Sequence, residues 1–356
     1  MSGPELMKKE TVPRPHFADW PTLLKDNARS GGQAQRVVHA PERALWQYRA
    51  GASARSSPIL FDGVLFVTSV DGVLHAIDAA TGLAKWKFRA EAQVHSTPSL
   101  CAERVLFGCD DGKVYAVDRH AGTKVWQTSA EAEVWASPVS CNGAVFFGSA
   151  DAKVYAVDAG SGRTRWVQEL GGRIYSTIYA TEQRLYVGCG DAKVYCLEAA
   201  SGKVVWSRPT DNGIDSSPAV AGGLVLVGSE DFLFYAMDAN TGEVRWKYET
   251  GLGIASSPAV SGDLTIFGGK DGFLYALDTQ TGHLRWKAAA GELVTAPAVI
   301  GEGIVCIQSG GTLAFDLASG KLVWRAALGG SLQSVPVLAG DRIYLASLGG
   351  EIYALQ

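Results

Sequence analysis

Eight tryptophans recur at a nearly constant interval along this chain of 356 residues. The interval is 40 residues six times and 38 residues at the last step. They stand at Trp46, Trp86, Trp126, Trp166, Trp206, Trp246, Trp286 and Trp324. A fixed period of this length is the signature of a repeat architecture, in which each copy forms one structural unit. The period therefore restricts the fold to an array of similar units.

Each repeat contains four short strand-like segments, which are clearest in the sixth copy at residues 256–260, 264–268, 270–278 and 281–286. The segments are rich in β-branched and aromatic residues, and Gly, Asp and Asn between them favour tight turns. Four antiparallel strands repeated radially form the blade of a propeller. We therefore predict an all-β fold, an eight-bladed β-propeller with four antiparallel strands per blade.

The two ends of the repeat region predict how the ring closes. The repeats begin with a single tryptophan strand at residues 44–48, and the chain ends at Gln356, where the next such strand is due. We expect the Trp46 strand to pair with the C-terminal blade, because this pairing leaves no open edge. The prediction is a propeller domain over 44–356 and an extended, proline-containing arm over 1–43. We also expect a monomer.

The tryptophans and the turns before them suit a structural role. One large aromatic side chain per blade can join neighbouring blades by burying its surface between them. The Asp-x-x-Thr/Ser-Gly turns, such as Asp78 to Gly82, could suggest a metal site. We interpret them as strand connections, because Asp and Gly supply the side-chain hydrogen bond and the positive φ that such turns need.

Ala76, Asp78, Gly82 and Trp86 fit the pattern Ala-x-Asp-x-x-x-Gly-x-x-x-Trp, which recurs at 236–246 and 276–286. In this pattern the chain resembles the quinoprotein-type eight-bladed propellers with pyrroloquinoline quinone-like repeats. That family includes dehydrogenases that carry the quinone with calcium in an axial funnel, and outer-membrane assembly propellers that serve as scaffolds. The resemblance implies the fold and leaves these two functions open.

Several features limit the function. The chain lacks the vicinal cysteine pair of many alcohol-oxidising quinoproteins, and its six cysteines lie at separated positions that predict no disulfide. A net charge of −4 without a clustered basic stretch argues against a nucleic-acid partner. No segment is apolar enough to span a membrane or to act as a signal peptide. As written, the chain is expected in the cytoplasm, or in the periplasm if a leader has been removed.

An internal comparison of the repeats indicates where function lies, since positions that change chemistry from copy to copy are not needed for the scaffold. One such position lies three residues before the Ser-Pro proline or its counterpart. It reads Arg55, His95, Trp135, Tyr175, Asp215, Ala255, Val294 and Gln333. The position two residues earlier reads Ser53, Gln93, Glu133, Arg173, Gly213, Gly253, Glu292 and Ser331. An apolar residue separates them, so both sets share one side of the chain.

The turn between the second and third strands varies as well, and it should lie beside these positions at the mouth of the axial channel. It reads Val70, Asp110, Ala150, Gly190, Glu230, Lys270, Gln308 and Leu348. We call this side of the propeller the funnel face. The predicted ligand-binding residues are Arg55, His95, Glu133, Trp135, Arg173, Tyr175, Asp215, Glu230, Lys270 and Gln333. Solvent-exposed turns also vary without function, but aromatic residues are enriched where ligands or partners dock.

The catalytic candidates are His95, Tyr175 and Asp215. His95 could bind a metal or transfer protons, or it could be an ordinary hydrogen-bonding residue of the wall. Trp135 could stack on a planar ligand, as the resemblance to dehydrogenases implies, or close the channel.

The charged residues of the funnel face leave alternatives as well. Glu133 and Asp215 could bind calcium or act as a base, although no cluster of oxygen ligands appears around them, so we expect no metal. Arg55 and Arg173 suit a carboxylate or phosphate, or they neutralise the two acids.

The first functional hypothesis is a non-catalytic binding or scaffold propeller without a cofactor, which binds a protein or a small ligand at the funnel face. The second is an oxidoreductase that uses pyrroloquinoline quinone with calcium, with Trp135 under the quinone, Arg55 or Arg173 on its carboxylates and Asp215 as base. A third is another enzyme with acid and base residues in the funnel.

Overall fold

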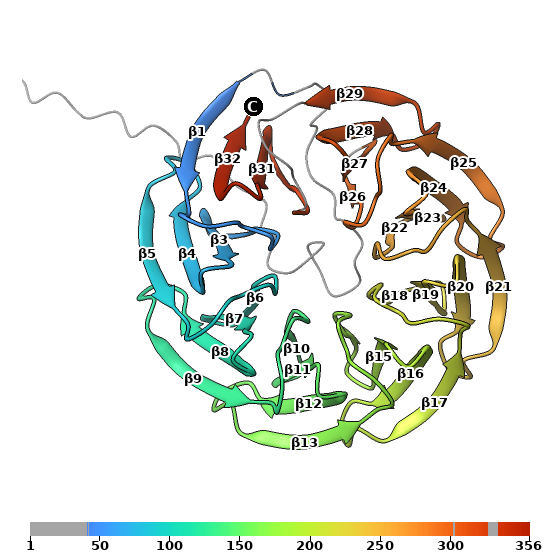
Figure 1. The fold of residues 1–356 in the computed structure, drawn as a ribbon, viewed down its shortest axis with the longest axis horizontal. Helices are drawn as coiled ribbons and strands as arrows, with labels where there is room; N and C mark the ends of the chain where they lie inside the picture. The colour runs from blue at the N-terminus through green and yellow to red at the C-terminus, as the bar shows by residue number, and fades with distance from the viewer. Residues whose placement is uncertain (1–40, 42, 302, 327–333) are drawn as a thin grey trace, which may run out of the picture.

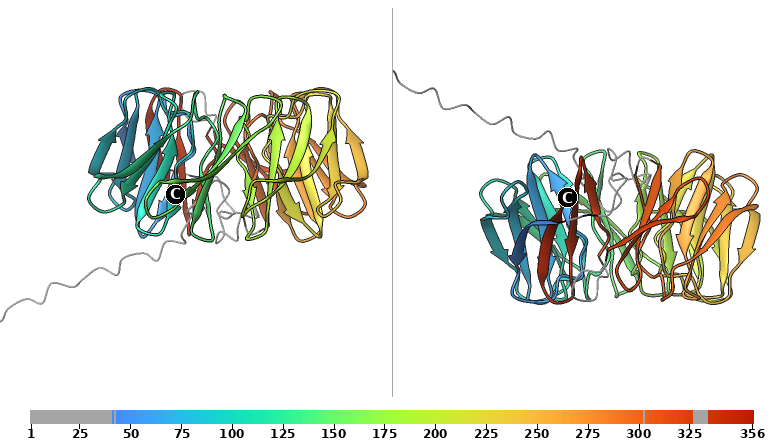
Figure 2. Two further views of the ribbon diagram at one scale, coloured as in Figure 1. Left: turned by 90° about the horizontal axis from the view of Figure 1, so that it is seen from below. Right: turned by 90° about the horizontal axis from the view of Figure 1, so that it is seen from above.

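The computed structural model describes residues 41, 43–301, 303–326 and 334–356. These residues form eight four-stranded sheets, all antiparallel, which stand as blades around a central axis (Figure 1). Side views show that the blades form a disc (Figure 2). The described part of the chain contains no helix, so none in it is long and apolar enough to cross a membrane. The prediction of an all-β, eight-bladed propeller is confirmed.

The first strand of each blade lies innermost and the fourth forms the outer wall (Figure 1). Blade one contains β2 (Ile59–Phe61), β3 (Val64–Ser69), β4 (Val73–Asp78) and β5 (Ala84–Arg89). Blade two contains β6 (Ser99–Cys101), β7 (Arg104–Gly108), β8 (Lys113–Asp118) and β9 (Lys124–Ser129). Blade three contains β10 (Val139–Cys141), β11 (Ala144–Gly148), β12 (Lys153–Asp158) and β13 (Thr164–Glu169). Blade four contains β14 (Tyr179–Ala180), β15 (Arg184–Cys189), β16 (Lys193–Glu198) and β17 (Val204–Pro209).

The second half repeats the same order, and the last blade takes its outer strand from the start of the chain. Blade five contains β18 (Ala219–Ala221), β19 (Leu224–Gly228), β20 (Leu233–Asp238) and β21 (Val244–Glu249). Blade six contains β22 (Ala259–Ser261), β23 (Leu264–Gly268), β24 (Phe273–Asp278) and β25 (Leu284–Ala289). Blade seven contains β26 (Val299–Ile300), β27 (Ile304–Gln308), β28 (Thr312–Asp316) and β29 (Leu322–Ala326). Blade eight contains β30 (Val337–Ala339), β31 (Arg342–Ala346), β32 (Glu351–Leu355) and β1 (Ala44–Arg49).

The ring closes as the ends of the sequence predict. Strand β1 pairs antiparallel with β32, and Trp46 stands opposite Ala354. Backbone hydrogen bonds between Arg43 and Gln356 extend this pairing, at 3.2 and 3.1 Å. The arm predicted over residues 1–43 lies outside the described residues except for Pro41 and Arg43.

Each blade docks on the next through its tryptophan. The indole nitrogen of Trp126 donates to the carbonyl of Ala159 in blade three, at 3.1 Å. The ring covers Gly162, where an added Cβ would lie 2.7 Å from the indole and the φ is +71°. The carboxylate of Asp158 in the same turn accepts the backbone N–H of Ser161 at 2.9 Å. The Asp-x-x-Ser-Gly pattern is therefore a docking turn, and its aspartate is occupied by the backbone.

One tryptophan lacks the hydrogen bond that seven others make to a carbonyl of the next blade. The buried indole nitrogen of Trp324 has no partner among the described residues. Its neighbour is the closing blade, where β32 and β1 are not joined by a turn that could offer the carbonyl.

Comparison of Trp324 with the other tryptophans can measure how much the indole hydrogen bond contributes to the free energy of unfolding. Trp126, Trp206 and Trp324 are each 7% exposed, so replacement by phenylalanine removes similar surface from each. We expect Trp126→Phe and Trp206→Phe to lose about 1 kcal/mol more free energy of unfolding than Trp324→Phe, because only they give up a hydrogen bond. Equilibrium unfolding in urea measures this difference, and equal losses in the three variants would contradict it.

A circle of hydroxyl groups joins the inner ends of the blades. A backbone N–H of one blade donates to a Ser or Thr hydroxyl of the next, at distances from 2.8 to 3.4 Å. The hydroxyls belong to Thr97, Ser137, Thr177, Ser217, Ser257 and Ser57. In blade seven Pro297 takes this position, as the pairing of Val299 with Cys306 shows. Proline has no N–H to donate, so it needs no acceptor from blade eight.

Candidate functional site

The two variable sets lie side by side on the funnel face. The backbone N–H of Asp110 donates to the carbonyl of Gln93, and that of Glu230 donates to the carbonyl of Gly213, at 2.9 and 3.1 Å. Equivalent bonds join the two segments in blades one, three, four and six. Each bond joins the turn to the segment before the first strand of the same blade. The variable turns and the variable positions before the first strands therefore surround the same opening.

Blade seven departs from the predicted register. Val294 is fully buried, and its N–H bonds to Gly269 as that of Ile254 bonds to Ser229, so it holds the apolar position. The placement of Val294 in the variable set was wrong by one residue, because Pro297 stands one residue earlier than the other prolines relative to the strand. The exposed residue at this place is Thr295.

The second turn of blade seven is also different from the prediction. Gln308 belongs to β27 and is 3% exposed, so it does not stand at the tip of the turn. The turn is two residues shorter than in blade six, and Gly310 lies where Lys270 lies there. Gln333 and Ser331 lie outside the described residues.

Three aromatic residues from consecutive blades form one array, which we call the aromatic ladder: His95, Trp135 and Tyr175. The Trp135 and Tyr175 rings are stacked, with centroids 5.0 Å apart and an interplanar angle of 22°. The His95 ring lies 5.6 Å from Trp135, tilted by 61°. Such offset and tilted arrangements are the favourable ones for aromatic pairs. Trp135 is 43% exposed, so the ladder offers apolar surface at the mouth of the funnel.

Polar bonds hold both ends of the ladder. The indole N–H of Trp135 donates to one carboxylate oxygen of Asp110 at 2.9 Å, and the other oxygen lies 3.4 Å from the imidazole of His95. At the far end the guanidinium of Arg173 donates to the hydroxyl of Tyr175 at 3.1 Å. The ladder is therefore fixed in position before any partner arrives.

A second group of charged residues lies on blades five and six. The ammonium of Lys270 contacts both carboxylate oxygens of Glu230, at 2.7 and 2.8 Å. Asp215 is exposed, yet surrounding protein atoms and then the negative charge of Glu230 raise its pKa, while Lys270 acts in the opposite direction. The Asp215 carboxyl therefore retains a proton to higher pH than an ordinary aspartate.

The three catalytic candidates make their described contacts with different partners. Trp135 separates His95 from Tyr175 in the ladder, and the Tyr175 hydroxyl already accepts a hydrogen bond from Arg173. Asp215 belongs to the other group, with Glu230 and Lys270. Acid–base catalysis needs its groups within hydrogen-bond reach of one substrate.

Two observations bear on the hypothesis of pyrroloquinoline quinone with calcium. Trp135 would be the platform for the quinone, but its ring is stacked on Tyr175 and lies against His95. Calcium takes six to eight oxygen ligands, and no group of three His, Cys, Asp or Glu side chains suited to a metal occurs in the parts of the chain described. All six cysteines are unpaired, as predicted.

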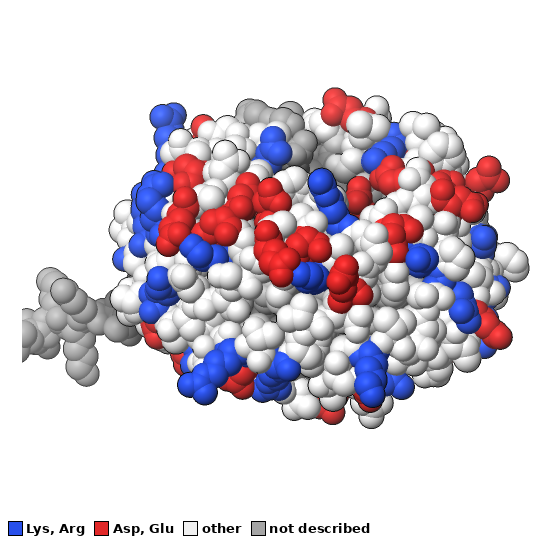
Figure 3. Space-filling model, turned by 60° about the horizontal axis from the view of Figure 1, so that its bottom comes forward, with Lys and Arg blue, Asp and Glu red and all other residues white. Residues whose placement is uncertain are grey.

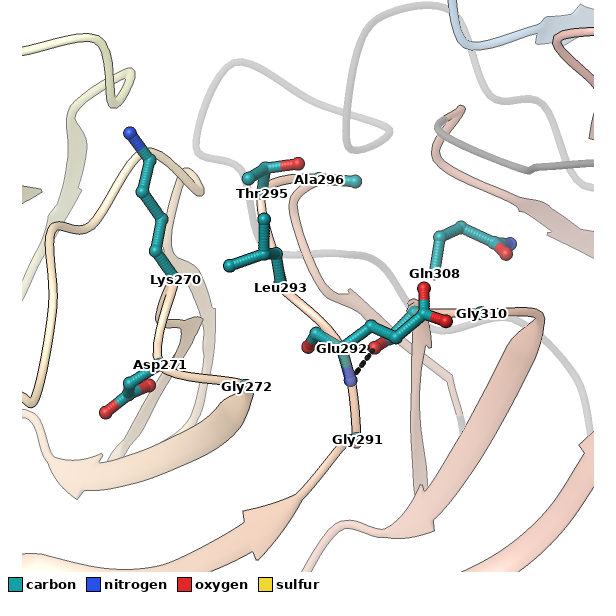
Figure 4. Close-up of a pocket in the computed structure, with 11 residues that line it drawn as sticks. Lys270, Asp271, Gly272, Gly291, Glu292, Leu293, Thr295, Ala296, Gln308 and Gly310 are labelled. Carbon is teal, nitrogen blue, oxygen red and sulfur yellow. Dashed lines mark hydrogen bonds between the residues drawn. The ribbon is translucent and has the colours of Figure 1, made fainter.

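A pocket of about 650 Å³ lies between blades six and seven on the same face (Figure 4). Glu292, Leu293 and Thr295 contribute to its wall. The predicted ligand-binding residues include Lys270, which also lines the pocket, but not these three. The signal that could have revealed the pocket is the final tryptophan interval of 38 residues, which shortens blade seven.

Charges of both signs alternate on the surface. Acidic side chains form a band across the middle of the view in Figure 3, with lysine and arginine side chains between them. Lysines on the rim of the funnel face are paired: Lys153 contacts Glu131 at 2.6 Å, and Lys113 contacts Glu91. The view therefore contains no continuous basic surface of the kind that nucleic-acid binding requires.

Comparison with known protein families gives one matching family model, which covers the repeats of this chain. The family model described as outer membrane protein assembly factor BamB matches residues 30–174, 110–191 and 150–356. No curated protein matches the sequence.

Solved structures resemble the chain in fold. BamB from Moraxella catarrhalis has a TM-score of 0.78 at 18% identity, over 88% of this chain and 99% of that one. Quinohemoprotein alcohol dehydrogenase from Comamonas testosteroni has a TM-score of 0.81 at 15% identity, over 95% and 80%. A europium-containing methanol dehydrogenase has a TM-score of 0.81 at 12% identity, over 95% and 98%. Identities this low establish the propeller fold alone.

Proposed function

This chain belongs to the family described as outer membrane protein assembly factor BamB, and on that basis we propose that it is a non-catalytic scaffold that binds a protein partner at the funnel face. The observation that carries the proposal is the aromatic ladder. His95, Trp135 and Tyr175 come from three separate blades and still form one stacked, partly exposed surface.

The chemistry of the ladder supports a protein partner. Aromatic side chains with a polar group at the edge dominate the binding energy of many protein interfaces, because they bury a large area with little loss of freedom. Asp110 and Arg173 hold the rings in place, so binding costs little ordering of the side chains. We do not adopt quinone-dependent oxidation, because Tyr175 stacks on the Trp135 ring and the described residues contain no group of three His, Cys, Asp or Glu side chains suited to a metal.

The location follows from the same proposal. A protein that assists outer membrane protein assembly works where those proteins are assembled. Of the two locations predicted from the sequence, the proposal therefore adopts the periplasm. This location requires export of the protein by a leader.

The experiment places a photo-crosslinking amino acid at Gln93 on the funnel face and, as a control, at Leu83 on the opposite face, where the side chain is 68% exposed. A protein captured from Gln93 and absent from Leu83 is the candidate partner. Trp135→Ala should then weaken its binding by at least about 30-fold, the effect of an interface hot spot of about 2 kcal/mol.

His283→Ala, an exposed change on the opposite face, is the matched control and should leave the affinity unchanged. Capture from Leu83 alone, or equal affinities of Trp135→Ala and the parent protein, would overturn the proposal.

A further inference from the structure

The pocket between blades six and seven has the size of a site for a small ligand. Its volume of about 650 Å³ lies within the range of ligand pockets in proteins. Figure 4 shows Lys270 and Asp271 on the blade-six side, Leu293 and Thr295 on the connection between the blades, and Glu292 beside Gly310.

The pocket exists because the repeat is interrupted here. In blade three the carboxylate of Asp151 accepts the backbone N–H of Glu131 and the hydroxyl of Tyr155, at 2.9 and 2.6 Å, and it fills the corner between two segments. Blades two, four, five and six contain the same Asp–Tyr pair. The shortened turn of blade seven has neither residue, and only the small hydroxyl of Ser309 accepts the N–H of Glu292, at 3.2 Å. The corner therefore remains open.

Each charged side chain of the pocket except Glu292 has a hydrogen-bond or ion-pair partner among the described residues. Lys270 is paired with Glu230, and Asp271 accepts the Tyr275 hydroxyl and the N–H of Gly251. The amide of Gln308 bonds to Thr312. The Glu292 carboxylate packs on Gly310, about 3.0 Å from the Cβ that an alanine would have there, and makes no hydrogen bond or ion pair with a described residue.

The pocket lining also includes apolar side chains. Leu293 is 59% exposed and Ala296 also lines the pocket. Lysine and arginine side chains combine a charged head with a methylene stem that packs on such a surface. A guanidinium also matches the geometry of a carboxylate through two parallel hydrogen bonds.

We propose that the pocket between blades six and seven binds a cationic group, an ammonium or guanidinium on an aliphatic stem, with Glu292 as its counter-ion and the stem among the apolar lining residues. The site is separate from the aromatic ladder and does not depend on the function proposed for it. The cation comes from a free amine or from a basic side chain of a protein.

The test titrates the full chain with agmatine, a free amine, and with N-acetyl-arginine amide, which imitates an arginine within a polypeptide, and follows the backbone amides of Gly291 and Gly310 by NMR. N-acetyl-citrulline amide is the neutral control of the same shape. We expect saturable binding of at least one cation and binding at least about tenfold weaker for citrulline, because the charge-assisted bond to Glu292 is lost. Tighter binding of agmatine would identify a free amine as the natural ligand, and tighter binding of N-acetyl-arginine amide a basic side chain of a protein.

Two variants locate the binding. Glu292→Gln removes the charge at constant shape, and Thr295→Trp fills the pocket. Each variant should bind the cation at least about tenfold more weakly than the parent protein. Ala255→Trp, the same enlargement at the equivalent position of blade six, should leave binding unchanged. Equal binding of citrulline and arginine, full binding by Glu292→Gln, or no saturable binding of either cation would overturn the proposal.

Discussion

Trp126→Ala should lower the free energy of unfolding by about 3–5 kcal/mol, the usual cost of removing a buried tryptophan. The side chain is 7% exposed, and it joins blade two to blade three. The variant loses the contact with Gly162 and the hydrogen bond to Ala159. Gly162 has no side chain that could fill the space that the indole leaves. Equilibrium unfolding in guanidinium chloride measures the loss.

Trp135→Ala is the matched control on the same blade junction. Its side chain is 43% exposed and its indole N–H donates to Asp110 at the surface of the funnel. We expect a loss within about 1 kcal/mol, since little buried surface and one accessible hydrogen bond are removed. A loss as large as that of Trp126→Ala would show that Trp135 serves the scaffold, as a plug of the channel, and the ladder would no longer support partner binding.

The fold could be predicted because every blade repeats the residues that build it. Gly162 and Trp126 are separated in the sequence, but the same pair recurs from blade to blade, so the period exposes a contact that one copy would not. Closure could be predicted for the same reason: the Trp46 strand has no blade of its own at the start of the chain.

Blade seven shows where this reasoning fails. Alignment on the proline placed Val294 at the funnel, but Pro297 occupies the position of Ser257 in blade six, so the register moves by one residue. Pro297 can stand there because it has no N–H to donate, and Val335 at the equivalent position of blade eight has no hydroxyl to accept one. Burial of Val294 against Gly268 then determines the register, and burial is a tertiary property that the local motif does not contain.

The candidate site was predicted as a set of chemically variable positions, and the contacts among them needed the structure. Trp135 and Tyr175 stand at equivalent positions of neighbouring blades, yet whether their rings stack depends on the distance between blades and on the rotamers chosen. The same is true of Asp110, which bonds to Trp135 from the preceding blade. Sequence periodicity assigns a face and leaves the pairing of side chains open.

His75 should make the propeller less stable in acid. It is 1% exposed, and its imidazole nitrogens lie 3.0 Å from the hydroxyls of Ser69 and Tyr48. Burial, with a smaller contribution from Lys87, lowers its pKa to about 4. The unfolded chain takes up this proton near pH 6.5, so stability is complete above about pH 6.5 and is lost as the pH falls toward 4. At about pH 4.5 the loss from His75 should be about 2.5 kcal/mol.

His75→Tyr isolates this effect from every other titrating group. Five blades carry tyrosine at the equivalent position, bonded to an aspartate as Asp71 would allow here. Tyr248 of blade five and Tyr275 of blade six have ring centroids 5.7 Å apart, so a tyrosine ring next to Tyr48 has a precedent in the same chain. The free energies of unfolding of parent and variant, measured in urea at about pH 7 and about pH 4.5, should diverge by about 2.5 kcal/mol, with the variant more resistant to acid. Parallel losses in the two proteins would mean that His75 already accepts its proton in the folded state, and that blade one opens locally to water before the ring unfolds.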